Sequence, residues 1–227
     1  MTVKTTRIRW TCHRLVPSRF PPTSLYDRVA DPADLDIIFA IENLTNPRVR
    51  DELGALQLVP AADRVSGEGT TPIMAAFTHL NPAGSRFTDG TWGVYYAGES
   101  VETAIAETMY HRARFLAATS EPAMEIDMRH YLANLSASLH DVRGKQAELP
   151  GLYDPVDYSV AQRFARTLRT DNSWGIVYDS VRRPEGQCVA VFRPKALANC
   201  RQSQHIAFVW DGSKMSGWYS KSAITPV

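Results

Sequence analysis

The chain contains very little cysteine. Cys12, Cys188 and Cys200 are the only three in 227 residues, and no two of them form a Cys-x-x-Cys pair. An odd number without that spacing argues against a disulfide framework and against a structural zinc site. The six histidines include no pair at metal-ligand spacing, so we expect no metal. Unpaired cysteines are also typical of a reducing cytoplasm, which we predict as the location.

The chain also lacks an excess of charge and a long apolar run. Lysine and arginine total 25 against 24 aspartates and glutamates, a net charge of +1, so no global positive field drives direct nucleic-acid binding. No apolar run is long enough to cross a bilayer, and residues 1–10 are charged with no apolar run after them. We therefore expect neither a membrane segment nor a signal peptide.

Three familiar catalytic or nucleotide-binding motifs are absent. The chain has no P-loop and no Gly-x-Gly-x-x-Gly, so any nucleotide must be held in another way. Ser180 ends an apolar segment but has no Gly-x-Ser-x-Gly around it, which leaves a hydrolase nucleophile unsupported.

What is present is a mixture of strand and helix patterns without a regular βαβ rhythm. We predict strands over 6–16, 94–96, 124–128, 135–142, 175–180, 188–192 and 206–210, the last before a polar tail, and helices from Asp31-Pro32, over 49–58, from Ser100 to Phe115 and over 159–169. This order favours an α+β fold, a single domain over 1–227 around a mainly antiparallel mixed sheet with flanking helices. A helical insertion is expected at about 23–66.

The segment 84–107 places three chemically useful side chains on successive elements. Arg86 lies in a glycine-containing loop, Tyr96 in a short strand, and Glu107 on a helix for which Ser100 is a good N-cap. Val101, Ala104 and Ile105 begin the buried stripe of that helix, and Glu107 lies at its flank.

Each of these residues has a structural alternative that is commoner for its type. Arg86 can bind phosphate oxygens through its planar guanidinium, but most arginines are simply solvated. Tyr96 can stack on a ligand ring or pack in the core. Glu107 is either a pocket carboxylate or a surface glutamate. Arg14, after His13 at a strand end, either faces a ligand or caps the strand.

The central stretch resembles the signature of the RES-domain family of bacterial toxin–antitoxin modules. Arg86 precedes Tyr96 by ten residues, and the run Tyr-Ala-Gly-Glu-Ser-x-x-x-Ala-x-x-Glu ends at Glu107. Segments 175–180 and 186–192 resemble the family's serine segment, which places Ser180, and Arg14 resembles its early arginine. Phe87-Thr88 departs from the Trp-Asn that usually follows the family's arginine.

The resemblance implies a fold similar to ADP-ribosyltransferases, NAD as the substrate, and cleavage of the nicotinamide–ribose bond without a metal. Glu107 would stabilise an oxocarbenium-like ribose. Arg14 and Arg86 would neutralise the pyrophosphate or orient the carboxamide, and Tyr96 would stack on nicotinamide. Ser180 would hydrogen-bond the ribose or nicotinamide end.

The resemblance also implies a type II toxin whose cognate Xre-like antitoxin protein blocks the active site. The first hypothesis for the reaction is transfer of ADP-ribose to a target protein. NAD phosphorolysis or hydrolysis, which would deplete cellular NAD, shares the same first step. Two other classes stay open: a ribonuclease toxin, for which no His or Lys acid–base pair is evident, and a non-catalytic antitoxin-binding module.

Overall fold

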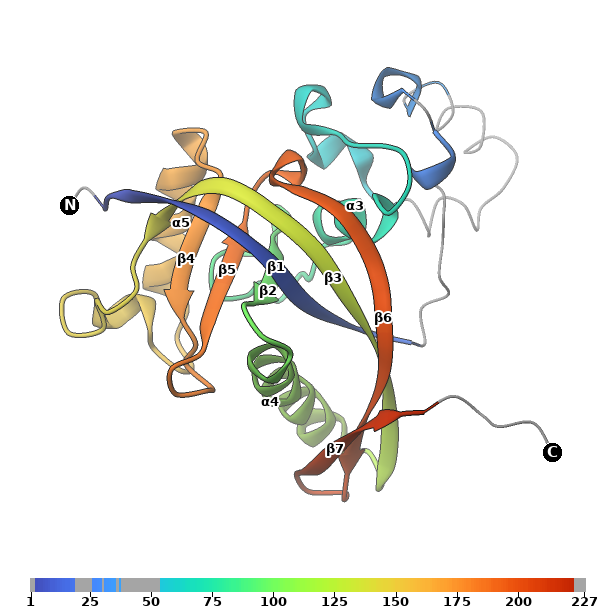
Figure 1. Ribbon diagram of the computed structural model, residues 1–227. Helices are drawn as coiled ribbons and strands as arrows, with labels where there is room; N and C mark the ends of the chain where they lie inside the picture. The colour runs from blue at the N-terminus through green and yellow to red at the C-terminus, as the bar shows by residue number, and fades with distance from the viewer. Residues whose placement is uncertain (1–2, 19–25, 30, 36, 38–53, 223–227) are drawn as a thin grey trace.

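The computed structural model describes residues 3–18, 26–29, 31–35, 37 and 54–222 (Figure 1). The strands are β1 (Thr5–Pro17), β2 (Tyr95–Gly98), β3 (Met124–Asp141), β4 (Gly175–Asp179), β5 (Gln187–Val191), β6 (Leu197–Trp210) and β7 (Met215–Lys221). The α-helices are α3 (Thr71–Thr78), α4 (Val101–Thr119) and α5 (Ser159–Thr170). Short 3₁₀ turns lie at Tyr26–Arg28, Pro32–Asp34, Leu56–Leu58, Ala61–Asp63, Pro150–Leu152 and Pro194–Ala196.

The sheet has seven strands in the order β1-β2-β5-β4-β3-β6-β7, and β1 also pairs with β3. This extra pairing closes β1, β2, β5, β4 and β3 into a ring, from which β6 and β7 extend. The pairing of β3 with β4 is parallel and the other pairings are antiparallel. The predicted α+β class with a mainly antiparallel mixed sheet is therefore confirmed.

The segments 124–128 and 135–142, predicted as two strands, form one long strand, β3, which ends at Asp141 and curves past β1 and β6 in Figure 1. The pairing of β3 with β6 shifts register between Arg129 and Tyr131 and again between Leu132 and Asn134. At the first shift the alternation of buried and exposed side chains is interrupted, because His130 and Tyr131 are both buried, while the strand continues. The two-strand prediction was wrong because an interrupted period looks like a strand end.

The two faces of the central strands pack in different cores. Tyr95 and Val189 belong to one core, whereas Ile176, Cys188 and Ala190 belong to a second core that is covered by α5. Successive side chains of a strand point to opposite faces, which explains the division. A third cluster packs Ala104 and Ile105 of α4 on β1, β3 and β6, and Figure 1 shows α4 between the end of β2 and the β6–β7 hairpin.

The predicted helix that begins at Ser100 is confirmed as α4, and the Ser100 side chain accepts a hydrogen bond from the Thr103 amide as its N-cap. Asp31 likewise caps the short turn Pro32–Asp34 through the Ala33 amide. Continuation of that helix through Ile38, and the start of the helix predicted over 49–58, lie outside the described residues. The insertion at about 23–66 therefore stays a prediction.

Two elements were not predicted from the sequence. The apolar piece Ile73–Phe77 is part of the helix α3, whose eight residues are too few for a clear helical period. The polar tail contains β7, an edge strand with Trp218 and Tyr219 both exposed. A strand that buries neither face lacks the alternation by which strands are recognised. Among the described residues, no helix combines the length and apolarity needed to cross a membrane.

Gly175 is a specific requirement of this sheet. It opens β4 with φ +141°, and a Cβ atom there would lie 2.2 Å from the Ala190 carbonyl oxygen on β5. We predict that Gly175→Ala lowers the free energy of unfolding by about 2–5 kcal/mol, from backbone strain and overpacking together. Urea denaturation checks this.

Gly217→Ala on β7 is the matched control, because nothing lies within 4 Å of a Cβ there. It should change the free energy of unfolding by no more than about 0.5 kcal/mol. Equal effects of the two substitutions would show that the constraint at Gly175 is absent.

Candidate active site

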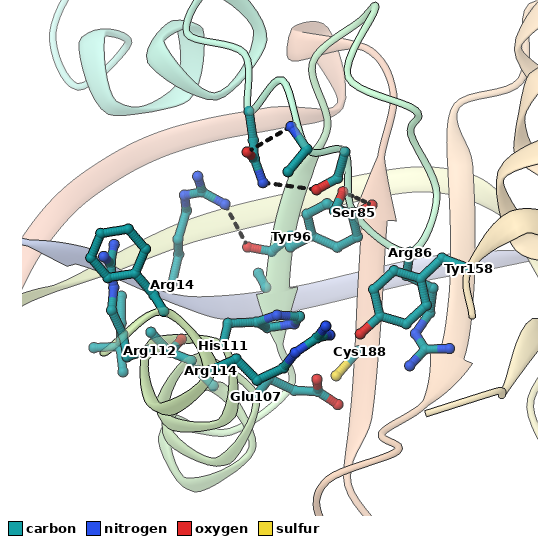
Figure 2. A pocket seen from close by; sticks show the side chains of 18 of the residues that line it. Arg14, Ser85, Arg86, Tyr96, Glu107, His111, Arg112, Arg114, Tyr158 and Cys188 are labelled. Carbon is teal, nitrogen blue, oxygen red and sulfur yellow. Dashed lines mark hydrogen bonds between the residues drawn. The ribbon is translucent and has the colours of Figure 1, made fainter. Parts of the chain in front are cut away.

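A pocket of about 1000 Å³ opens between α4, the ends of β1 and β2, and the N-terminal end of α5 (Figure 2). Four of the five predicted site residues line it: Arg14, Arg86, Tyr96 and Glu107. The fifth, Ser180, is not among the lining residues but contacts one of them, as described below. The structure thus brings together side chains that are separated by up to 166 positions, from Arg14 to Ser180.

The floor of the pocket is made by neighbouring positions on three strands. Gly98 of β2 pairs with Cys188 of β5, and Cys188 pairs with Tyr178 of β4. Paired residues share a face of the sheet, so the side chains of Cys188 and Tyr178 and the backbone of Gly98 all line the pocket. Burial raises the pKa of the Cys188 thiol, with a second contribution from Glu107, and this favours the protonated thiol over the thiolate.

Glu107 is held in place from the far side of the pocket. The Ser180 hydroxyl donates to Glu107 Oε1 over 2.6 Å, and the Val181 amide donates to the same oxygen over 3.2 Å. Ser180 Oγ in turn accepts hydrogen bonds from the amides of Arg182 and Arg183. Among the described residues both hydrogen bonds to the carboxylate are at Oε1, which leaves Oε2 for a ligand.

The Tyr96 hydroxyl positions the loop that carries Arg86. It accepts hydrogen bonds from the Phe87 amide and from the Ser85 hydroxyl, each over 2.8 Å. Burial raises the pKa of Tyr96 to about 12, an effect that these hydrogen bonds oppose. Tyr95, next along the strand, is fully buried on the other face, as the alternation of a strand requires.

Arg86 is not a solvated surface arginine, because only 6% of it is exposed. Its Nη1 donates to the carbonyl oxygens of Leu152 and Asp154, over 2.9 and 2.8 Å. The guanidinium carbon lies 4.7 Å from the centre of the Tyr158 ring, which allows a cation–π interaction. These contacts fix the guanidinium in one orientation at the pocket wall.

Arg14 provides a second fixed cation on the opposite side. Its Nη1 donates to the Tyr96 carbonyl oxygen over 2.9 Å, and its guanidinium lies over the Tyr95 ring. Its buried Nε has no hydrogen-bond partner among the described residues. The alternative that Arg14 merely caps a strand does not account for its place in the pocket wall.

Sequence reasoning missed several lining residues: Arg112, Arg114, His111, Tyr158 and Gln162. Helical spacing offered one usable signal, because His111 follows Glu107 by one turn of α4. Desolvation lowers the pKa of His111, Glu107 opposes this, and Arg182, Arg86 and Arg114 lower it further. Tyr158 and Gln162 carried no signal, since their proximity to Arg86 depends on the tertiary fold.

The exposed Asp157 also lines the pocket, and the arrangement joins several cations to the Glu107 carboxylate above a β-sheet floor. Arginines can neutralise an anionic ligand, and the carboxylate can stabilise a cation that develops next to it. Among the residues the structure describes, no group of three or more histidine, cysteine, aspartate or glutamate side chains is placed to hold a metal ion.

The family model of the RES domain matches residues 61–211 of this chain. The chain belongs to the RES-domain family. Arg86, Tyr96, Glu107 and Ser180 of this RES domain lie inside the matched residues, and Arg14 lies before them. The predicted resemblance is confirmed at the level of the family.

Two individual proteins are also similar to this RES-domain chain. The uncharacterised protein y4oC of Sinorhizobium fredii (strain NBRC 101917 / NGR234) is 31% identical over 211 residues, which cover 92% of this chain and 86% of the relative. A solved structure of the M. tuberculosis MbcT–MbcA toxin–antitoxin complex contains a chain with a TM-score of 0.44 and 11% identity, covering 88% of this chain and 87% of that one.

A pair of stacked histidines beneath the pocket makes the free energy of unfolding depend on pH. His13, which lines the pocket, lies 2.9 Å from His130 through Nδ1 and Nε2, and their rings are stacked. His130 is 3% exposed, and burial lowers its pKa from 6.5 to about 4, with a further contribution from His13. Burial also lowers the pKa of His13, an effect that Glu102 opposes.

The stabilising effect of neutral His130 is complete above pH 6.5 and decreases as the pH falls toward 4, because the unfolded chain binds this proton first. The full loss is about 3 kcal/mol, at about 1.4 kcal/mol for each unit of pKa. We predict that His130→Gln flattens this acid limb, measured by urea unfolding at several pH values from 7.5 down to 5. An identical slope in the variant and the parent would contradict the assignment.

Proposed function

We propose that this RES-domain protein is an NAD-consuming toxin that cleaves the nicotinamide–ribose bond and transfers ADP-ribose to a target protein. The observation that carries the proposal is the convergence of Arg14, Arg86, Tyr96 and Glu107 in one pocket. Membership of the RES-domain family supports it independently.

The size and charge of the pocket suit a dinucleotide. A volume of about 1000 Å³ is at the upper end for small-molecule sites, as an extended ligand such as NAD requires. Arg14 and Arg86 approach the pocket from separate elements, and both have fixed orientations. Fixed guanidinium groups match the oxygens of a pyrophosphate better than flexible ammonium groups do.

In the proposed reaction the bond between ribose C1′ and the nicotinamide nitrogen breaks, and its electron pair stays with the nitrogen. Nicotinamide leaves as a neutral molecule, and the ribose becomes an oxocarbenium-like cation. Oε2 of Glu107 would face this cation, while Ser180 and the Val181 amide hold Oε1. A carboxylate that is already oriented stabilises developing charge without reorganisation cost.

A nucleophilic side chain of the target protein then attacks C1′ and releases its proton to solvent. The rim of the pocket is open to a macromolecule, since Phe115 is 48% and Val156 is 64% exposed there. Phosphate is the alternative acceptor, and it would yield ADP-ribosyl phosphate. Arg112 and Arg114, which also line the pocket, are the observation that favours this second candidate.

The antitoxin partner belongs to the same proposal. An Xre-like protein encoded beside this chain would insert a terminal segment into the pocket, with apolar side chains on Phe115 and Val156 and acidic side chains on the arginines. Such a segment would occupy the space that NAD needs.

We predict that Glu107→Gln lowers the rate of nicotinamide release from NAD about 100- to 1000-fold, the usual cost of removing one preorganised electrostatic contact in a transition state. Purified protein is incubated with NAD, with and without phosphate, and nicotinamide is measured by liquid chromatography. Mass spectrometry of added cell proteins and of the small products identifies the acceptor.

Glu148→Gln is the matched control, because Glu148 is exposed and pairs only with Lys145 on the surface among described residues. It should leave the rate unchanged. Intact NAD with the parent protein would defeat the proposal. Degraded RNA beside intact NAD would select a ribonuclease toxin, and growth inhibition that survives Glu107→Gln would select a non-catalytic binding module.

The partner is tested separately by coexpression with the neighbouring gene product. We predict that the two proteins copurify and that the complex releases nicotinamide at least about 10-fold more slowly than the free toxin. Phe115→Asp should weaken the complex, since a like-charged rim repels an acidic segment. Failure to form a complex would count against an encoded antitoxin.

A further inference from the structure

Tyr158, immediately before α5, lies against the most buried cation of the pocket. It lines the pocket, and the Arg86 guanidinium carbon lies 4.7 Å from the centre of its ring. A planar guanidinium over an aromatic face is stabilised by the ring quadrupole, more so when water is excluded. The ring therefore helps to set the orientation of Arg86.

The hydroxyl group of Tyr158 has a different environment from its ring. It is buried, yet it has no hydrogen-bond partner in the part of the chain that the structure describes. Figure 2 shows it directed toward the side of the pocket where Glu107 and Cys188 lie. An unsatisfied buried hydroxyl is costly, and because the Tyr158 side chain lines the pocket, a ligand seated beside it would supply the missing partner.

Tyr153 shows what a structural tyrosine looks like in the same segment. Its hydroxyl donates to the Val142 carbonyl oxygen, and the side chain does not line the pocket. The contrast separates a tyrosine whose hydroxyl stabilises the fold from one whose hydroxyl is left for a ligand.

The backbone that carries Tyr158 is fixed relative to the Arg86 loop. Gln162, one turn along α5, donates through Nε2 to the carbonyl oxygens of Ser85 and Thr88, over 3.0 and 3.2 Å. The Asp157 carboxylate accepts the Ser159 amide at the start of the helix. The two hydrogen bonds of Gln162 thus join the Tyr158 segment to the Arg86 loop, in addition to the contact between the Tyr158 ring and the Arg86 guanidinium.

We propose that Tyr158 is a substrate-contacting residue: its ring orients Arg86, and its hydroxyl donates a hydrogen bond to the bound dinucleotide beside Glu107. This inference rests on the proposed NAD cleavage and deepens it. Next to the bond that breaks, NAD offers oxygens of the ribose and of the nicotinamide carboxamide, and the Tyr158 hydroxyl would donate to one of these.

The test compares Tyr158→Phe and Tyr158→Ala in the nicotinamide-release assay, with thermal unfolding of each protein. Tyr158→Phe keeps the ring, so we expect kcat/KM to fall about 3- to 10-fold, the effect of one hydrogen bond. Its Tm should not fall, because the hydroxyl has no hydrogen-bond partner among the residues that the structure describes. Tyr158→Ala also removes the support of Arg86, and we expect kcat/KM to fall about 10-fold further.

Tyr219→Phe is the control, since Tyr219 lies on the exposed strand β7, far along the sheet order from β2, and its hydroxyl donates a hydrogen bond to Glu125 of β3. It should leave kcat/KM unchanged. An active parent protein with a Tyr158→Phe variant of equal kcat/KM would overturn the role of the hydroxyl while leaving the proposed function intact. A parent protein that releases no nicotinamide would instead defeat the proposed function itself, and this inference with it.

Discussion

The hydrogen bond from Ser180 to Glu107 is the contact on which the site depends. It joins the residue after β4 to the second turn of α4, two elements that are 73 positions apart in the chain. At 2.6 Å it has the length of a charge-assisted bond to a carboxylate, the stronger kind of hydrogen bond. Ser180 can donate in this direction because the amides of Arg182 and Arg183 occupy its acceptor sites.

Burial of Arg86 is the second constraint, and it has an energetic cost. A buried cation is unfavourable unless hydrogen bonds or neighbouring charges compensate it. Here two backbone carbonyls and the Tyr158 ring do so, while the Tyr96 hydroxyl holds the loop on the other side. The segments that provide these contacts come from residues 85–96 and 152–158, so the pocket exists only when the domain is fully folded. Rigidity of this kind is what a preorganised site requires.

The segment from Arg86 to Glu107 was predictable because its signals are local. Turn residues, the strand residue Tyr96 and the Ser100 cap follow one another at short spacing, and each agrees with the fold. Residues whose roles depend on distant packing were not predictable: nothing near Tyr158 in the sequence indicates that it lies beneath Arg86. The long strand β3 was predicted as two strands for a similar reason. Its bulges arise from its pairing with β6, and the sequence alone shows only an interrupted alternation of apolar and polar residues.

The proposed function depends on one physical claim, that Glu107 faces the ribose of a dinucleotide held between Arg14 and Arg86. A crystal structure of the Glu107→Gln protein with intact NAD tests this claim most directly. The account predicts the nicotinamide ribose within about 3 Å of the side chain at position 107, a normal hydrogen-bond distance, with the pyrophosphate between the two arginines. NAD bound elsewhere on the protein, or an empty pocket at saturating NAD, would contradict it.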